Sequence, residues 1–82
     1  MIMTVEISMY PLQQDYKPLI LAFIAKLNSY PGLRINTTAT ATTIIGDYVQ
    51  VMRTLTEMLA WSHDQHGKAV YVTKFIPGYE PD

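Results

Sequence analysis

Cysteine is absent from this chain of 82 residues, and charged residues make up only 16 % of it. Without cysteine there can be no disulfide, no thiolate metal site and no cysteine nucleophile. Six Lys and Arg residues stand against seven Asp and Glu, with no basic run, which leaves no electrostatic footprint for nucleic acid or an anionic membrane. We therefore expect neither partner.

Long apolar runs are also lacking. No stretch approaches the ~20 apolar residues that span a bilayer, and residues 1–6 lack the basic start and apolar run of a signal peptide. We expect a cytoplasmic protein. The hydrophobic fraction of 49 % indicates a single domain over residues 1–82, in which association with a second copy would add stability. The scarcity of charge suggests that a partner covers part of the surface.

The apolar residues of the first half change their period along the chain. Alternation over 3–10 predicts a strand with one buried face, stopped by Pro11. Apolar residues then recur at helical spacing from Tyr16 to Leu27, which predicts an amphipathic helix with Pro18 in its first turn. Asp15 is the expected N-cap, and residues 30–32 end the helix.

The second half predicts two strands, a helix and a last strand. Residues 33–41 and 42–45 are dense in Thr and Ile, and we expect a short, irregular hairpin near 39–42 or a bulge between them. Gly46 is expected to break the strand and Asp47 to cap a helix that Gly67 ends. That helix has its apolar stripe at Tyr48, Val51, Met52, Leu55, Leu59 and Ser62. Residues 68–75 form the last strand, before a proline-broken tail over 76–82.

The order βαββαβ predicts an α+β protein with the ferredoxin-like arrangement, two helices on one face of a four-stranded antiparallel sheet. The other face of the sheet is then open. Alternation places these residues on the helix side: Met3, Val5, Ile7, Met9, Leu33, Ile35, Val70 and Val72. It places these on the open side: Thr4, Glu6, Ser8, Tyr10, Arg34, Asn36, Thr38, Thr40, Tyr71, Thr73 and Phe75.

Hydroxyls and aromatic rings therefore share the predicted open face. Such a face can bind a flat heteroaromatic molecule, since rings stack on rings and hydroxyls bond to ring nitrogens and exocyclic groups. Two other interpretations stay open. Threonine is a good strand residue that needs no ligand to explain it, and the uncharged face could pair with a second copy of the chain.

The ionisable residues indicate little chemistry. His63 and His66 have no further ligand at a matching spacing, and the helix dipole explains histidines at a helix C-terminus, so we expect no metal site. Asp47 either only caps its helix or also attracts a cationic ligand. Glu6 either pairs with Arg34 across the sheet or accepts from a ligand amino group.

No nucleophile–base pair can be nominated. The two arginines of the chain, Arg34 and Arg53, follow no glycine-rich loop of the kind that acylphosphatase chemistry needs. The Thr-rich strands also lack the aromatic and basic motif of ferredoxin-like RNA-binding domains. We expect a protein that is not an enzyme and holds no cofactor.

Three stretches of the sequence form a recognisable set: Ile-Ser-Met-Tyr-Pro-Leu at 7–12, Thr-Thr-Ile-Ile-Gly at 42–46, and the closing residues 73–82. Together they resemble the YkoF-like family of thiamine- and hydroxymethylpyrimidine-binding proteins. The resemblance covers nearly the whole chain and implies a ferredoxin-like domain, single or in tandem, that assembles so that sheets meet. It implies binding of the pyrimidine part of thiamine without turnover, in uptake or salvage of the vitamin. Ser8, Tyr10 and Thr42 match the motif positions.

With this resemblance, we expect a binding site on the open face. Hydrogen bonds to the pyrimidine are expected from Ser8, Thr38, Thr40 and Thr42, apolar contact from Tyr10 or Phe75, and charge balance from Glu6 or Asp47. Thr38 and Thr40 come from the shared face, not from the motif. Ala41 departs from the family pattern, which often has a serine there, and could weaken or alter the ligand.

A single domain implies that its second half comes from another chain, in a homodimer or homotetramer. The alternative function is a structural or regulatory homo-oligomerisation module that has no small ligand. A small hydrolase is a third class, and no constellation of residues supports it.

Overall fold

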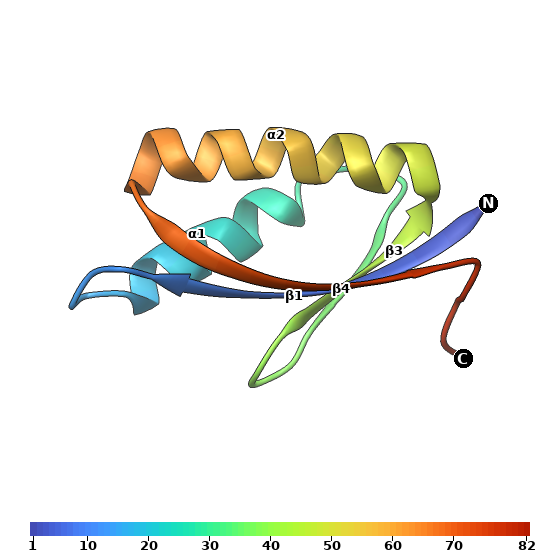
Figure 1. Ribbon diagram of the computed structural model, residues 1–82, viewed down its shortest axis with the longest axis horizontal. Helices are drawn as coiled ribbons and strands as arrows, with labels where there is room; N and C mark the ends of the chain where they lie inside the picture. Colours follow the sequence, from blue (N-terminus) through green and yellow to red (C-terminus); the bar gives the residue numbers. More distant parts are fainter.

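The computed structural model describes residues 1–82, with the element order β1 (Ile2–Pro11), α1 (Lys17–Leu27), β2 (Arg34–Thr37), β3 (Thr42–Asp47), α2 (Tyr48–His66) and β4 (Ala69–Pro77). The strands form one four-stranded antiparallel sheet in the order β2-β3-β1-β4. Both helices lie on one face of this sheet (Figure 1), which confirms the predicted ferredoxin-like α+β fold. Neither helix has both the length and the apolar character that crossing a bilayer requires.

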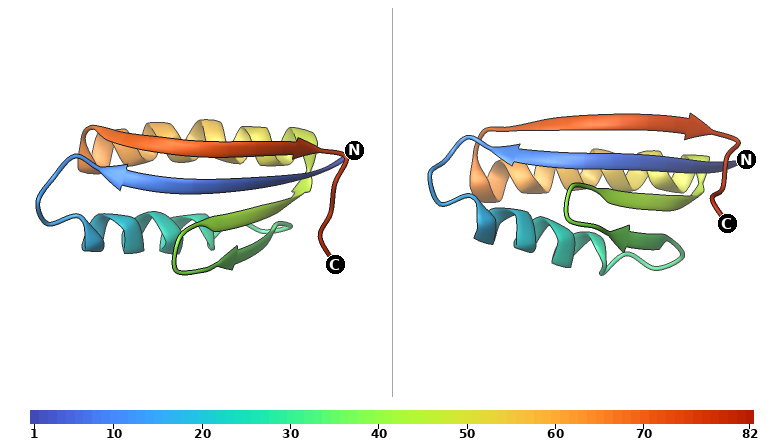
Figure 2. Two further views of the ribbon diagram at one scale, coloured as in Figure 1. Left: turned by 60° about the horizontal axis from the view of Figure 1, so that its bottom comes forward. Right: turned by 90° about the horizontal axis from the view of Figure 1, so that it is seen from below.

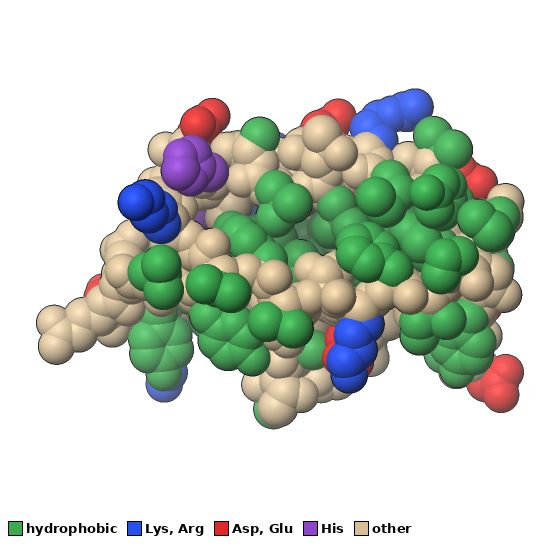
Figure 3. Space-filling model, viewed as in Figure 1, with side chains coloured by type: hydrophobic (Ala, Val, Ile, Leu, Met, Phe, Trp, Pro, Cys, Tyr) green, Lys and Arg blue, Asp and Glu red, His purple; other side chains and the backbone are tan.

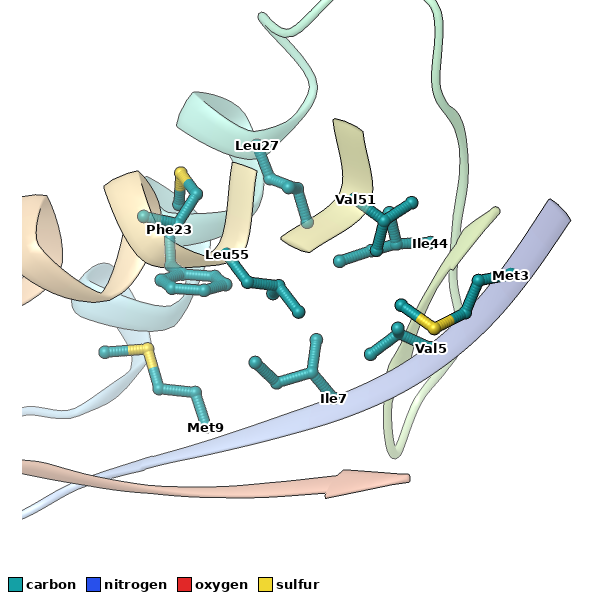
Figure 4. Close-up of a cluster of buried hydrophobic side chains, with 10 residues drawn as sticks. Met3, Val5, Ile7, Met9, Phe23, Leu27, Ile44, Val51 and Leu55 are labelled. Atoms are coloured by element: carbon teal, nitrogen blue, oxygen red, sulfur yellow. The ribbon is translucent and has the colours of Figure 1, made fainter. Parts of the chain in front are cut away.

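The hydrophobic core lies between the sheet and the helices (Figure 4). β1 is central in the sheet, and its predicted buried residues all point into this core. The buried cluster consists of Met3, Val5, Ile7, Met9, Phe23, Leu27, Ile44, Val51, Leu55 and Met58. Burying a side chain of this size contributes about 1.5–3 kcal/mol, so these residues account for much of the stability of a domain this small.

β4 has the opposite orientation to the one predicted. Residues paired across an antiparallel ladder point to the same face, and Val5, Ile7 and Met9 pair with Phe75, Thr73 and Tyr71. The side chains of Tyr71, Thr73 and Phe75 therefore lie on the helix side, and those of Val70 and Val72 on the open side.

The physical reason for this orientation is the position of β4 at the edge of the sheet. The long side chain of Tyr71 reaches back to α2, where its hydroxyl donates to Ser62 Oγ at 2.6 Å. The Tyr71 ring also packs on Phe23 with a centroid distance of 5.7 Å. Val70 and Val72 remain half exposed on the open face.

The helix ends agree with the prediction in α2 and differ in α1. Asp47 caps α2 as expected, accepting from the backbone N–H groups of Val49 and Gln50 at 3.1 and 3.4 Å. The N-cap of α1 is Tyr16, not Asp15, and no side chain bonds there. α1 ends at Leu27, the last residue of the predicted stripe and three residues before Tyr30, where the stretch expected to end the helix begins.

The apolar stripe of α2 is partly as predicted. Val51, Leu55 and Ser62 are buried, but Leu59 is half exposed and the fully buried residue of that turn is Met58. Gly67 follows the helix with a φ of 80°, a conformation that favours glycine.

The β2–β3 hairpin is shorter than predicted. β2 ends at Thr37, and the turn is closed by a bond of 2.9 Å from Thr38 N–H to the Ala41 carbonyl. Gly46 does not break the strand but lies within β3, opposite Met3. A Cβ at this position would come within 2.6 Å of Leu33 Cδ2, so glycine allows the close packing of Leu33.

The C-terminal tail covers one end of the open face. Thr4 Oγ1 donates to the Tyr79 carbonyl at 2.6 Å, and Arg34 Nη2 donates to the Pro81 carbonyl at 2.9 Å. Thr4 and Ile45 are consequently buried, although their side chains lie on the face away from the helices.

Candidate functional site

β1 extends beyond the end of β3. Its pairing with β3 stops at Ile7 opposite Thr42, whereas its pairing with β4 continues to Pro11 opposite Ala69. Figure 2 shows the hairpin turning back partway along β1, with α1 behind the gap that this leaves in the sheet. The last residues of β1 therefore have a strand on one side only.

A pocket of about 520 Å³ lies at this gap. It is lined by residues 7–11 of β1, by residues 37–42 of the hairpin, and by Tyr16, Ile20, Phe23 and Ile24 at the start of α1 and along it. We call it the β1 pocket. No charged residue lines it. Its volume is in the range of small-molecule sites, and its lining is mostly apolar with several hydroxyls, as such sites usually are.

Several of these hydroxyls hold the hairpin in shape. Ser8 Oγ donates to the Thr40 carbonyl at 2.9 Å, and the hydroxyls of Thr37 and Thr42 bond to each other at 3.1 Å. Thr38 Oγ1 donates to the Ala41 carbonyl at 3.2 Å and accepts from Thr40 N–H at 3.4 Å. The donors of Ser8 and Thr38 are engaged in these bonds, and of the pair Thr37 and Thr42 one hydroxyl is engaged as the donor.

Three other hydroxyls of the pocket lining have no hydrogen bond within the protein. They belong to Thr40, Tyr10 and Tyr16, one from the turn, one from β1 and one from the start of α1. Each can donate one hydrogen bond and accept others. The free hydroxyls are therefore available to a bound molecule from three sides.

The structure brings five of the predicted site residues to the β1 pocket: Ser8, Tyr10, Thr38, Thr40 and Thr42. Their predicted position on the open face is not fully correct. Thr42 pairs with Ile7 and so points to the helix side, where it is buried, and Thr38 and Thr40 lie in the turn beyond the end of β2. The pocket lies at the edge of the sheet, in contact with α1.

The other three predicted residues lie outside the pocket. Glu6 Oε1 is 3.6 Å from Lys74 Nζ, so its partner is not Arg34, which is 3.6 Å from Glu80 instead. Asp47 is at the opposite end of β3, where it caps α2 and lies 3.7 Å from the N-terminal amine. Phe75 is on the helix side of the other edge strand. The pocket therefore has no carboxylate to balance a cation.

Sequence reasoning missed the α1 side of the pocket and Met9. Ile20, Phe23 and Ile24 were predicted as core because they fit the helical stripe, and Met9 because it alternates with Ile7. The available signal was strand length, since the predicted strand at 3–10 is longer than its neighbour at 42–45. Unequal neighbours in a sheet leave part of the longer strand unpaired.

The histidines lie apart from this site, at the C-terminal end of α2. The His66 ring packs edge-on against Trp61, with a centroid distance of 5.5 Å, and His66 Nε2 is buried without a hydrogen-bond partner. No group of three or more His, Cys, Asp or Glu side chains is placed to hold a metal ion.

Comparison with protein-family models and with curated protein sequences finds no match. Solved structures do match. Protein SP2199 from Streptococcus pneumoniae has a TM-score of 0.87 at 22 % identity, over 96 % of this chain and 89 % of its own. TM0486 from Thermotoga maritima is provisionally described as a thiamine biosynthesis or salvage protein. It has a TM-score of 0.81 at 21 % identity, over 92 % of this chain and 82 % of its own.

A DUF77 domain of unknown function from Bacillus cereus also matches, with a TM-score of 0.72 at 16 % identity, over 98 % of this chain and 77 % of its own. At identities this low, the three likenesses show a common fold. They cover nearly the whole of this chain, so the fold is shared from β1 to β4.

Proposed function

We propose that this protein binds the hydroxymethylpyrimidine moiety of thiamine, free or within the vitamin, without chemically converting it. The observation that carries the proposal is the β1 pocket, which has no charged lining residue and presents hydroxyls and aromatic rings. The resemblance of its sequence motifs to the YkoF-like family supports the same ligand. So does the fold shared with TM0486, described in connection with thiamine biosynthesis or salvage. We place its role in vitamin uptake or salvage, in the cytoplasm.

The chemistry of the pocket suits a pyrimidine. This ring is flat and neutral, with ring nitrogens that accept hydrogen bonds and an exocyclic amine that donates them. Thr40, Tyr10 and Tyr16 offer free hydroxyls, and Phe23 adds apolar surface. A thiazolium ring carries a positive charge, which no carboxylate of the pocket would offset. The pocket therefore favours the pyrimidine half of the vitamin.

The same lining supports a role without catalysis. General acid–base or nucleophilic chemistry needs a titratable pair within hydrogen-bond reach of the substrate. The only titratable side chains along the pocket are the phenols of Tyr10 and Tyr16. No base adjoins either phenol in the pocket lining.

Isothermal titration of hydroxymethylpyrimidine and of thiamine into the purified protein tests the proposal. We expect saturable binding of the free pyrimidine at least as tight as that of thiamine. Thr40→Val removes a free hydroxyl and should weaken binding about 5- to 30-fold, since an unmade hydrogen bond costs about 1–2 kcal/mol. Thr43→Val, on the open face outside the pocket, is the matched control. No heat and no thermal shift with either ligand would contradict the proposal.

A different observation favours assembly. The open side of β4 carries Val70, Val72 and Ile76, which are 49 %, 53 % and 44 % exposed. Figure 3 shows further apolar side chains along the band between α2 and β4, which is on the helix side of this edge strand. We propose that a second copy of this chain covers the open side of β4, giving a homodimer or homotetramer.

Light scattering during gel filtration tests the assembly. Val72→Lys should shift the protein to monomer, because a charge in an apolar interface loses its hydration. Val49→Lys, at a residue of similar exposure on α2, is the control. A wild-type monomer at high micromolar concentration would contradict this proposal. An oligomer that binds neither thiamine nor the pyrimidine would favour the alternative function, an oligomerisation module without a small ligand.

A further inference from the structure

The backbone groups of β1 alternate between its two neighbours. On the β4 side, the Ile2 carbonyl accepts from Gly78 N–H at 2.7 Å and Leu12 N–H donates to the Lys68 carbonyl at 3.3 Å. On the β3 side, the Met1 carbonyl accepts from Tyr48 N–H at 2.8 Å. Even-numbered residues of β1 therefore bond toward β4 and odd-numbered residues toward β3, because both groups of a residue point the same way in an antiparallel strand.

By this alternation, the N–H and the carbonyl of Met9 point to the β3 side, where β3 has already ended. The ladder stops at Ile7 opposite Thr42, and no hydrogen bond to Met9 comes from the turn or from any side chain. The next position in register would be Thr40. Its carbonyl already accepts from Ser8 Oγ, and its N–H already donates to Thr38 Oγ1.

These two unpaired groups belong to a residue that is only 8 % exposed and that lines the β1 pocket. Buried backbone groups in folded proteins are nearly always paired with protein, water or a ligand, because an unmade bond leaves their desolvation uncompensated. The donor and the acceptor stand side by side along one strand edge, facing into the pocket.

We propose that the N–H and carbonyl of Met9 form the recognition edge of the β1 pocket, and that they read an aminopyrimidine. A ring nitrogen beside an exocyclic amine offers an acceptor next to a donor, the complement of one strand residue. The proposal rests on the proposed function and specifies which edge of the ring is read. The bound ring would continue the sheet where β3 ends, with Ile20 and Phe23 of α1 over its helix-side face.

A peptide strand fits this edge less well than a single ring. Met9 is the one residue there with both groups free, since Ile7 is paired with Thr42 and Pro11 has no N–H. The turn at 38–41 closes the gap on one side. Added strands need several consecutive ladder bonds, and this edge offers one pair.

Amide exchange measured by NMR on the uniformly ¹⁵N-labelled protein tests the inference. Without ligand, the Met9 amide should exchange at least about 100-fold faster than that of Ile7, which is bonded to β3. Saturation with hydroxymethylpyrimidine should slow Met9 exchange by at least about tenfold and move its proton resonance downfield. Ile7 and the β4-bonded Tyr10 should keep their exchange rates, which makes them internal controls.

An analogue of the pyrimidine that lacks the exocyclic amine is the second probe. It should bind about 10- to 100-fold more weakly, because the Met9 carbonyl loses its donor. A Met9 amide already as protected as Ile7 without ligand would overturn the inference. Tight binding that leaves Met9 exchange unchanged, or that does not need the amine, would overturn the inference alone. Absence of any binding would overturn the proposed function together with it.

Discussion

The side chain of Ser8 and the main chain of Thr40 are joined by a hydrogen bond of 2.9 Å, in which Ser8 Oγ is the donor. This contact holds the β2–β3 turn against the end of β1, where no ladder bond does so. It also takes up the Thr40 carbonyl, which would otherwise be free to face Met9. Ser8 therefore has a structural role in the pocket, because it fixes the position of the turn, in addition to any contact that it makes with a ligand.

Replacing this serine should weaken binding more than it weakens the fold. In Ser8→Ala the turn loses its tie to β1, and we expect the dissociation constant for hydroxymethylpyrimidine to rise about 3- to 10-fold by calorimetry. Because the bond is exposed, the free energy of unfolding should fall by less than about 1 kcal/mol. Ser29→Ala removes another exposed serine bond, to the Lys26 carbonyl, and should leave binding unchanged. Equal binding by both variants would remove Ser8 from the site.

The effect of having alanine instead of serine at position 41 can be tested by substitution. This residue lines the β1 pocket, and its carbonyl is held by Thr38, so its backbone position is fixed. Ala41→Ser adds a hydroxyl where the resembling family often has one. We expect tighter binding of the pyrimidine, by about 3- to 10-fold, with an unchanged melting temperature. Weaker binding in calorimetry would show that the ligand lies elsewhere or that the rim has no room.

The sequence predicts the architecture well where one face of an element is buried. In β1 the alternation is unambiguous, because Met3 to Met9 on one face alternate with polar residues on the other, and the central strand buries that apolar face. In β4 both faces carry large apolar residues, so alternation cannot choose between Val72 and Tyr71. The choice depends on which side chain can reach Ser62 and Phe23 from an edge strand.

The candidate site was predictable in composition but not in position. The hydroxyl residues at 38–42 stand out as a cluster, yet no turn motif marks where β2 ends, so the predicted strand runs four residues past Thr37. The place of the pocket depends on where β3 stops relative to β1, a property of pairing register. Met9 illustrates the limit, since its side chain fits the core pattern and the pairing register alone shows that its backbone groups have no strand beside them.

The contact that fixes the orientation of β4 can be measured directly. Tyr71→Phe leaves the fully buried Ser62 Oγ without its donor and should lower the free energy of unfolding by about 1–2 kcal/mol in urea titrations. Ser62→Ala should lower the free energy of unfolding by less than Tyr71→Phe, because the Tyr71 hydroxyl is partly exposed and can bond to water instead. The double variant should show a coupling energy of about 0.5–1.5 kcal/mol. Additive effects would place the two residues apart, as on the open face first predicted.

Asp47 should prove structural. Its side chain accepts from the first backbone N–H groups of α2, so Asp47→Ala should reduce the free energy of unfolding by about 0.5–2 kcal/mol. Asp47→Asn is the matched control: it keeps a capping side chain and should lower the free energy of unfolding by only a few tenths of a kcal/mol. Neither variant should change the affinity for thiamine, since Asp47 lies outside the β1 pocket. A loss of thiamine affinity in both variants would restore the role in charge balance that the sequence left open.

A tyrosine in the loop after α1 should make the stability of the protein depend on pH in the alkaline range. The Tyr30 hydroxyl donates to Glu57 Oε1 at 3.0 Å. Partial burial, then the hydrogen bond and the negative charge of Glu57, raise the pKa of the Tyr30 phenol above its ordinary value. A raised pKa favours the protonated form in the folded state, so its contribution to stability is complete below about pH 10 and is lost as the pH rises through the raised value.

Tyr30→Phe isolates this contribution. At pH 8 the wild-type protein should be more stable than the variant by about 0.5–1 kcal/mol, the size of one exposed hydrogen bond. Above pH 10 that difference should shrink, because ionisation of the phenol breaks its donation to Glu57 and places two negative charges side by side. Glu57→Gln removes the negative charge but keeps an acceptor for Tyr30, so the free energy of unfolding should change less between pH 8 and pH 11. Urea titrations at pH 8 and pH 11 that give the same difference would show that Tyr30 ionises alike in the folded and unfolded chain.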